Sequence, residues 1–263
     1  MRLIACCAAW VVLSASAAGA ADPVSGTWKT GDGPTARVYV FKVIGDRFTG
    51  IVCGPCDDPA SVFRIEDGRV LDEHRANFFI RYEVGGPSFE RFGPYREHVE
   101  ASIDRNAMQL SGRPEPDAAA AANTLSLTRV VENFELSAQS LAPLPGGAPR
   151  PPAAQIEGHW VSVGRIAQQN WILKVRGNEL WGLVCGPCTP AVVTMIDGRV
   201  DGDTITFYIN HIDTPPDQNR KGIQRNVMTG TIAGGDNANI LKFTWVSEGS
   251  GNTGEITMIG PVR

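Results

Sequence analysis

Short runs in which apolar and polar residues alternate recur along most of the chain, and each is bounded by Gly, Asp or Asn. Alternation with a period of two is typical of β-strands that bury one face, whereas no window keeps a helical period over three turns. We therefore expect an all-β protein. The predicted strands are residues 37–43, 47–53, 77–82 and 98–103 in the first half, and 171–175, 179–185, 204–209, 227–232, 240–246 and 255–259 in the second half.

The order of these runs repeats, because the chain contains one domain written twice. Residues 42–56 and 174–188 are identical at 9 of 15 positions, at a constant offset of 132. Gly26-Thr27-Trp28 matches Gly158-His159-Trp160 at the same offset, and the sequence Asp-Gly-Arg-Val at 67–70 returns at 197–200. Repetition at this level predicts two tandem copies, residues 24–130 and residues 156–263, each of the size of a small domain.

Two segments differ in composition from the copies. Residues 1–20 combine Arg2, an apolar Ala-rich run and Ala18-Gly19-Ala20, the small-x-small pattern that signal peptidase cuts. We expect a cleaved signal peptide, and so a periplasmic or secreted protein, because an uncleaved anchor needs about 20 strongly apolar residues. No later segment is apolar enough to span a bilayer. Residues 131–155 carry five prolines, which predicts an extended linker.

Each copy has to cover the apolar face of a sheet of six to eight antiparallel strands, either by closing a small barrel or by folding a sandwich. An opening Gly-x-Trp strand, a meander with a Gly-Asp or Gly-Asn turn, a strand containing Gly50 or Gly182, and an Asp-Gly-Arg-Val hairpin resemble the secreted bacterial calycin-like proteins. The resemblance implies lipocalin- or avidin-like up-and-down barrels, with Trp28 and Trp160 closing the floor and a mouth that accepts an apolar or amphipathic small molecule. It transfers no binding residue to this chain.

Each copy also carries one Cys-Gly-Pro-Cys motif, at Cys53 and Cys56 and at Cys185 and Cys188. In an oxidising compartment the favoured interpretation is one local disulfide per copy, which makes the turn after a strand rigid. A thiol-disulfide redox site is one alternative, although no helix is predicted after either motif and two aspartates follow the first one. Zinc bound by all four cysteines is the other alternative, provided that the two copies dock.

The remaining features favour a binding protein over an enzyme, and they predict no cofactor. The formal charge of −4 and the lack of a basic cluster give no reason to expect a nucleic-acid partner. No phosphate-binding loop, nucleophile elbow or glycosidase-like carboxylate pattern is present. The second copy alone contains Trp171, Trp181 and Trp245, which predict an aromatic ligand cup there unless they only fill the core. We expect a non-catalytic exported protein that binds a small apolar ligand or a cell-envelope component, with a redox or zinc-binding role of the CGPC motifs as the alternative.

Overall fold

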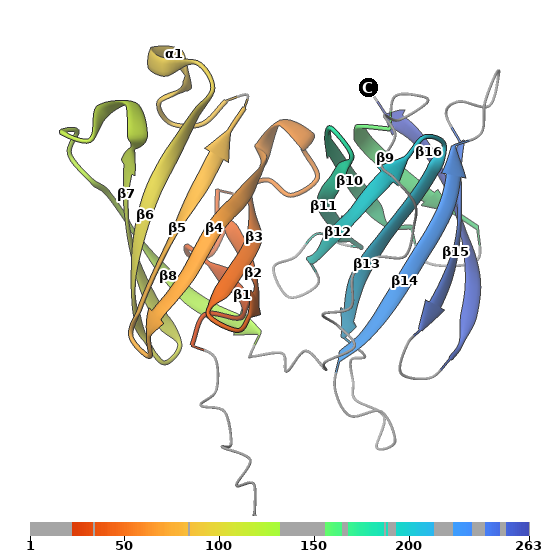
Figure 1. The fold of residues 1–263 in the computed structure, drawn as a ribbon, viewed down its shortest axis with the longest axis horizontal. Coiled ribbons are helices and arrows are strands. Elements are labelled where there is room, and N and C mark those ends of the chain that lie inside the picture. Colours follow the sequence, from red (N-terminus) through yellow and green to blue (C-terminus); the bar gives the residue numbers. More distant parts are fainter. Residues whose placement is uncertain are drawn as a thin grey trace, which may run out of the picture.

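The two copies form two closed antiparallel β-barrels of eight strands each in a computed structural model of the chain (Figure 1). The fold class predicted from the sequence is therefore confirmed, with the strand number at the upper end of the expected range. The structure describes residues 23–33, 35–83, 85–131, 156–164, 168–186, 188, 193–212, 223–232, 240–247 and 251–262. The predicted signal peptide at 1–20, and the predicted linker after residue 131, lie outside the described residues. Among the described residues no helix has the length and apolar character needed to cross a membrane.

In the first barrel each strand pairs with the next one along the chain, and the last strand returns to the first. The alternation of buried and more exposed side chains is regular in the strands, as in Tyr95–Asp104, and it places one set of side chains inside the barrel. The strands are β1 Gly26–Lys29, β2 Val38–Ile44, β3 Arg47–Cys53, β4 Val62–Asp72, β5 Arg75–Tyr82, β6 Tyr95–Asp104, β7 Ala107–Pro114 and β8 Asn123–Val131. Three short helical turns connect them: η1 Pro59–Ser61, α1 Phe89–Phe92 and η2 Glu115–Asp117.

The second barrel repeats this order, again with each strand paired to its chain neighbours and the last strand paired to the first. Its strands are β9 Gly158–Val163, β10 Asn170–Arg176, β11 Glu179–Cys185, β12 Thr194–Asp201, β13 Thr204–Ile212, β14 Ile223–Ile232, β15 Ile240–Ser247 and β16 Thr253–Val262.

Equivalent tryptophans of the two copies are fully buried in the two barrel cores. The indole Nε1 of Trp28 donates a hydrogen bond to the carbonyl oxygen of Val24 at 2.9 Å, and that of Trp160 donates to Ile156 at 2.8 Å. Each indole thus buries a large apolar surface while its one polar atom is satisfied by the backbone just before the first strand. This shared arrangement ties the start of each copy to its barrel.

The Asp-Gly-Arg-Val sequences do not form hairpins, contrary to the sequence-based expectation. They lie inside β4 and β12, where the strands continue through them with a bulge at Asp67 in the first copy. A Cβ atom on Gly68 would lie 2.4 Å from Cδ2 of Phe48, and one on Gly198 would lie 2.3 Å from Cβ of Phe207. Gly68 therefore permits close packing of the Phe48 ring, and Gly198 permits close approach of the neighbouring strand at Thr206 and Phe207.

The two barrels pack side by side through the outer faces of β2–β4 and β10–β12 (Figure 1). The contact uses equivalent positions of the repeat, since Val40 and Ile51 correspond to Ile172 and Leu183 at the offset of 132. We call the buried group the inter-barrel cluster; it comprises Val38, Val40, Ile51, Cys53, Cys56 and Val62 of the first barrel, and Ile172, Trp181, Leu183, Cys185, Val193 and Met195 of the second. Ion pairs accompany it, between Lys42 and Asp197, Arg64 and Glu179, and Arg176 and Glu66.

Candidate ligand-binding site

The two CGPC motifs form one disulfide each, between Cys53 and Cys56 and between Cys185 and Cys188, as the local-disulfide interpretation predicts. Three of these cysteines belong to the inter-barrel cluster and Cys188 packs against it. Docking of the barrels therefore brings both motifs to one interface, but each sulfur is bonded within its own motif. Within the described part of the chain, no group of three or more His, Cys, Asp and Glu side chains is arranged to hold a metal ion.

The surroundings of the motifs differ from those of a redox-active thiol. The first motif is followed by the three-residue turn η1, capped by the Asp58 side chain, which accepts a hydrogen bond from the Ala60 N–H at 2.9 Å. The second precedes β12, which begins at Thr194. A three-residue turn has little of the dipole with which a long helix lowers the pKa of a cysteine at its N-terminus. In the disulfide-bonded form, the two motifs thus stabilise the inter-barrel cluster, which contains or contacts all four cysteines.

The three tryptophans predicted to line a cup in the second copy do not share one cavity. Trp171 is buried in the core of the second barrel, with its ring centroid 6.2 Å from that of Phe207, and the partly buried Trp245 packs against the same core. Trp181 lies on the outer face of β11, in the inter-barrel cluster. The barrel wall therefore separates Trp181 from the other two.

A polar cluster lies inside the first barrel, where we locate the candidate site. Its members are Arg37, Tyr39, Tyr82 and Glu97, and its centre is the Glu97 side chain, which is only 6% exposed. The Tyr82 hydroxyl donates a hydrogen bond to Oε2 of Glu97 at 3.0 Å. Beside them is a cavity of about 10 Å³, enough for roughly one water molecule. The remaining lining is mostly apolar, from Ile80, Val99, Leu110 and Leu125.

Burial dominates the electrostatics of this cluster. It raises the pKa of Glu97, against the opposing effects of the Tyr82 hydroxyl and the Arg37 charge. It also raises the pKa of Tyr39 to about 12, and Arg37 again opposes the shift. The Tyr39 hydroxyl makes no hydrogen bond of ordinary geometry within the described residues, although Arg37 lies near enough to lower its pKa. The site therefore holds a neutral hydroxyl donor without an acceptor, beside a carboxyl group that favours its protonated form.

Gly112 on β7 makes the room that the buried carboxyl group occupies. A Cβ atom at this position would lie 2.4 Å from Oε1 of Glu97 and 2.8 Å from its Cδ. Any larger residue at this position would therefore displace the carboxyl group. The pairing of Val99 with Gly112 across β6 and β7 fixes this juxtaposition.

The second barrel has different residues at the equivalent positions and provides an internal control. The pairing of Trp28 with Tyr39 matches that of Trp160 with Trp171, so Trp171 stands where the first barrel has Tyr39. The same offset places Gln169 at the position of Arg37, and both donate a backbone N–H to the hydroxyl of a residue seven positions earlier. The second barrel thus has the amide of Gln169 in place of the Arg37 guanidinium, and the indole of Trp171 in place of the Tyr39 phenol.

The strand registers extend the comparison to Glu97 and to Gly112. Ile80 pairs with Glu97 as Ile209 pairs with Asn226, which places Asn226 at the position of Glu97. Val99 pairs with Gly112 as Met228 pairs with Trp245, which places Trp245 at the position of Gly112. The second barrel thus closes with no charged residue at these positions and fills the space with indole rings. The polar cluster of the first barrel is therefore not a requirement of the fold.

A short segment around α1 covers the polar cluster. Tyr95 stacks on Tyr82 with ring centroids 4.8 Å apart, and the Ser88 N–H donates to the Tyr95 hydroxyl at 3.2 Å. Phe89 and Phe92 of α1 pack against the same core. An ion pair of 2.8 Å between Arg91 and Asp117 joins α1 to η2, the turn after β7. Figure 1 shows α1 at one end of the first barrel, beyond the ends of β5 and β6.

Sequence reasoning missed this cluster, although part of the signal was present. Comparison of the copies at the offset of 132 shows Arg37 against Gln169 and Tyr39 against Trp171. Glu97 lies 129 positions before its counterpart and Gly112 lies 133 before its own, so no single offset aligns both. Only the strand registers reveal that these residues share a site.

Comparison with known proteins identifies no family for the chain, since neither a protein-family model nor a curated protein matches its sequence. The fold itself defines the class to which the protein belongs, a tandem pair of eight-stranded antiparallel barrels.

Proposed function

We propose that this is a non-catalytic binding protein whose first barrel holds a small, largely apolar ligand by a single polar group. The observation that carries the proposal is the buried cluster of Tyr39, Tyr82 and Glu97, in which Tyr39 and Glu97 are replaced by Trp171 and Asn226 in the second barrel. Burying polar groups without full hydrogen bonding costs stability, and the second barrel has neither a phenol nor a carboxyl group at the positions of Tyr39 and Glu97. A ligand that completes the hydrogen bonds supplies a reason for keeping them.

The polar end of the ligand is a hydrogen-bond acceptor, such as a carbonyl or carboxylate oxygen. Two groups beside the cavity can donate to it: the Tyr39 hydroxyl, for which the described residues supply no acceptor, and the Arg37 guanidinium. The apolar remainder of the ligand packs against Leu110 and Leu125.

Binding requires the first barrel to open, because the cavity holds only about one water molecule in the structure described. The segment around α1 is the element that can move without breaking the barrel, since it lies outside the strand ladders. Opening breaks the ion pair between Asp117 and Arg91, and the Arg91 side chain is largely exposed already. It also moves Phe89 and Phe92 away from the core.

Two expectations from the sequence support the setting of this function. The N-terminal residues 1–20 favour export to the periplasm or beyond. The resemblance to calycin-like barrels favours a ligand inside a barrel. The site we propose is in the first copy, whereas the tryptophan content had favoured the second.

The proposal is tested by calorimetric titration of the full chain with three probes of equal length: octanoic acid, octanamide and octylamine. We expect the acid and the amide to bind and the amine to bind at least about tenfold more weakly, the effect of losing one acceptor at a buried donor. Equal binding of the three probes, or binding of none, contradicts the proposal.

A matched pair of variants locates the site. Tyr39→Phe and Trp171→Phe each remove one buried polar atom for which the described residues supply no hydrogen-bond partner of ordinary geometry, at equivalent positions of the two barrels. We expect Tyr39→Phe to weaken octanoic acid binding about tenfold and Trp171→Phe to leave it unchanged. The reverse result would move the site to the second barrel.

A further inference from the structure

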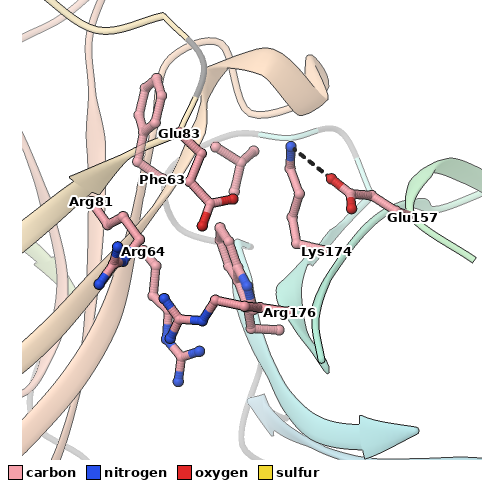
Figure 2. A pocket seen from close by; sticks show the side chains of 9 residues that line it. Phe63, Arg64, Arg81, Glu83, Glu157, Lys174 and Arg176 are labelled. Atoms are coloured by element: carbon pink, nitrogen blue, oxygen red, sulfur yellow. Dashed lines mark ion pairs between the residues drawn. The ribbon is translucent and has the colours of Figure 1, made fainter. Parts of the chain in front are cut away.

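A second pocket lies between the two barrels and is independent of the polar cluster inside the first. Its cavity volume is about 80 Å³, larger than that of the first barrel. Phe63 of β4 and Trp181 of β11 supply aromatic walls. Six charged residues line the rest, with Arg64, Arg81 and Arg176 on one flank in Figure 2 and Glu83, Lys174 and Glu157 on the other.

Two carboxylates shared by three guanidinium groups form the wall behind the pocket. Glu66 accepts from Arg81 at 3.0 Å and from Arg176 at 2.7 Å. Glu179 accepts from Arg176 at 3.2 Å and from Arg64. Burial alone would raise the pKa of Glu179, but these two arginines outweigh it and lower the pKa. These ion pairs hold the three arginines in place beside the pocket.

Arg64 is the cation whose hydrogen bonds are least complete. Its side chain is 12% exposed, and its Nε and Nη1 are buried and make no hydrogen bond within the part of the chain that the structure describes. The guanidinium carbon lies 6.0 Å from the ring centroid of Trp181. A buried guanidinium with two unused donors favours an additional acceptor beside it.

Lys174 shows the same deficiency when it is compared with its repeat counterpart. Lys42, 11% exposed, donates a hydrogen bond to Oδ2 of Asp197 across the interface at 2.7 Å. Lys174 is 13% exposed, but its nearest carboxylate oxygen, on Glu157, is 3.6 Å away, too far for a hydrogen bond. The pocket thus lies where the second copy of this ion pair is missing.

The acidic side of the pocket is also incompletely paired. Glu83 is exposed and makes no ion pair with any of the described residues, and Figure 2 shows its carboxylate directed into the pocket. The pocket therefore presents a carboxylate without an ion-pair partner among the described residues, a guanidinium with two unused donors, and an ammonium group whose nearest described carboxylate lies beyond hydrogen-bond distance. A simple anion satisfies only the cations and is repelled by Glu83, whereas a simple cation satisfies only the carboxylate.

We infer that this inter-barrel pocket binds a small zwitterion of the α-amino-acid type. Its carboxylate accepts from Lys174 and Arg64, its ammonium group lies at Glu83, and its side chain rests against Trp181. Both charges of such a ligand then meet a group of opposite charge in the same pocket. The site exists only when the two barrels are docked, because each barrel contributes part of it.

The test is calorimetric titration of the full chain with glycine, L-alanine and L-leucine. The tightest of the three is then compared with its N-acetyl derivative, which lacks the ammonium group, and with its amide, which lacks the carboxylate. We expect at least one amino acid to bind and both derivatives to bind at least about tenfold more weakly. Equal affinity of the N-acetyl derivative identifies a plain anion site and overturns the inference, as does binding of none of the three amino acids.

Three variants separate recognition from loss of structure. Glu83→Gln is expected to weaken amino-acid binding about tenfold while leaving the N-acetyl derivative unaffected or improved, a reversal that misfolding does not produce. Lys174→Met is expected to weaken the amino acid and the N-acetyl derivative alike. Lys42→Met, the matched control, removes an interface lysine outside the pocket and is expected to leave amino-acid binding within about twofold. Unchanged binding in Glu83→Gln contradicts the inference, and the octanoic acid titration continues to test the first barrel separately.

Discussion

The first and second barrels have the same strand order and the same buried tryptophan at their start, but they fill their interiors in different ways. The first barrel places Glu97 over Gly112, and the second places Trp245 at the position of Gly112 and Asn226 at that of Glu97. In the second barrel the small residue is shifted to Gly254, where a Cβ atom would lie 2.6 Å from the Trp245 ring. One barrel wall thus accommodates either a buried carboxyl group or an indole.

This difference separates what the barrel needs from what a ligand needs. An apolar interior costs less free energy than a polar one, because buried polar groups lose hydrogen bonds to water. A position where a sequence departs from that solution without a structural benefit is a candidate for function. The duplication allows this comparison within one chain, since the second barrel buries an indole and an amide where the first buries a phenol and a carboxyl group.

The largest expected effect comes from placing the residue of the second barrel into the first. Gly112→Trp forces a side chain into the space of Glu97. We expect it to lower the free energy of unfolding by about 3 kcal/mol, near the upper end of the usual destabilisation by an overpacked core. Adding Glu97→Asn, which recreates the pair of the second barrel, should recover part of this loss. Urea unfolding with hydrogen exchange resolved by barrel measures both. Gly186→Ala is the control, because no atom lies within 4 Å of its added Cβ. A fully stable Gly112→Trp variant would show that the first barrel has spare room and that the comparison is wrong.

Removal of the disulfides ranks next. Because each closes a loop between residues only three positions apart, each should contribute about 2 kcal/mol or less. We expect replacing Cys53 and Cys56 by serine to cost more than replacing Cys185 and Cys188, since Cys56 is buried and Cys188 is only partly buried. Denaturant unfolding of the two double variants gives the difference. Both should keep octanoic acid binding, and its loss would indicate a functional role of the thiols.

The pH dependence of stability should distinguish the barrels through Glu97. Burial raises the pKa of Glu97 in the folded protein, so its protonated form is favoured by folding. Its contribution to stability is therefore complete below the pKa of the unfolded chain and is lost as the pH rises through the folded pKa, by on the order of 1 kcal/mol for each unit of elevation. We expect Glu97→Gln to lose less stability than wild type between about pH 4 and about pH 8. Asn226→Ala should retain the slope of the wild type, and parallel profiles for wild type and Glu97→Gln would contradict the shift.

The smallest expected effect is a gain in stability. Tyr39→Phe removes a buried hydroxyl that makes no hydrogen bond of ordinary geometry with the described residues, and we expect the free energy of unfolding to rise by up to about 1 kcal/mol while octanoic acid binding weakens. Opposite changes in stability and affinity identify a group that is kept for binding. Thermal unfolding without and with the probe measures the two quantities. A variant that is less stable than wild type would assign Tyr39 a structural role.

The strands and the repeat were predictable because local patterns carry them. Alternation in β2, β3 and β11 appears in the sequence within one or two residues of the observed bounds. The Asp-Gly-Arg-Val sequences were misassigned as hairpins, because Gly next to Asp favours a turn locally while the packing of Phe48 and Phe207 requires glycine inside a strand. The three tryptophans of the second copy were expected to share one surface, but Trp181 lies on the outer face of the barrel and the other two lie at its core. Adjacent positions such as Leu180 and Trp181 face opposite sides of the barrel wall.

The sequence by itself determined the all-β class and the duplication and favoured the local pairing of the cysteines, because each follows from residues that are near one another or related by a constant offset. Only the tertiary structure decided that the barrels dock through β2–β4 and β10–β12 and that Glu97 meets Tyr82 over Gly112. It also decided that Lys42 is hydrogen-bonded to a carboxylate across the interface, whereas the carboxylate nearest to Lys174 is too far away for a hydrogen bond. Strand register and barrel docking bring these residues together across loops of unequal length. The energetic cost of a polar group depends on the burial that results, which no local pattern encodes.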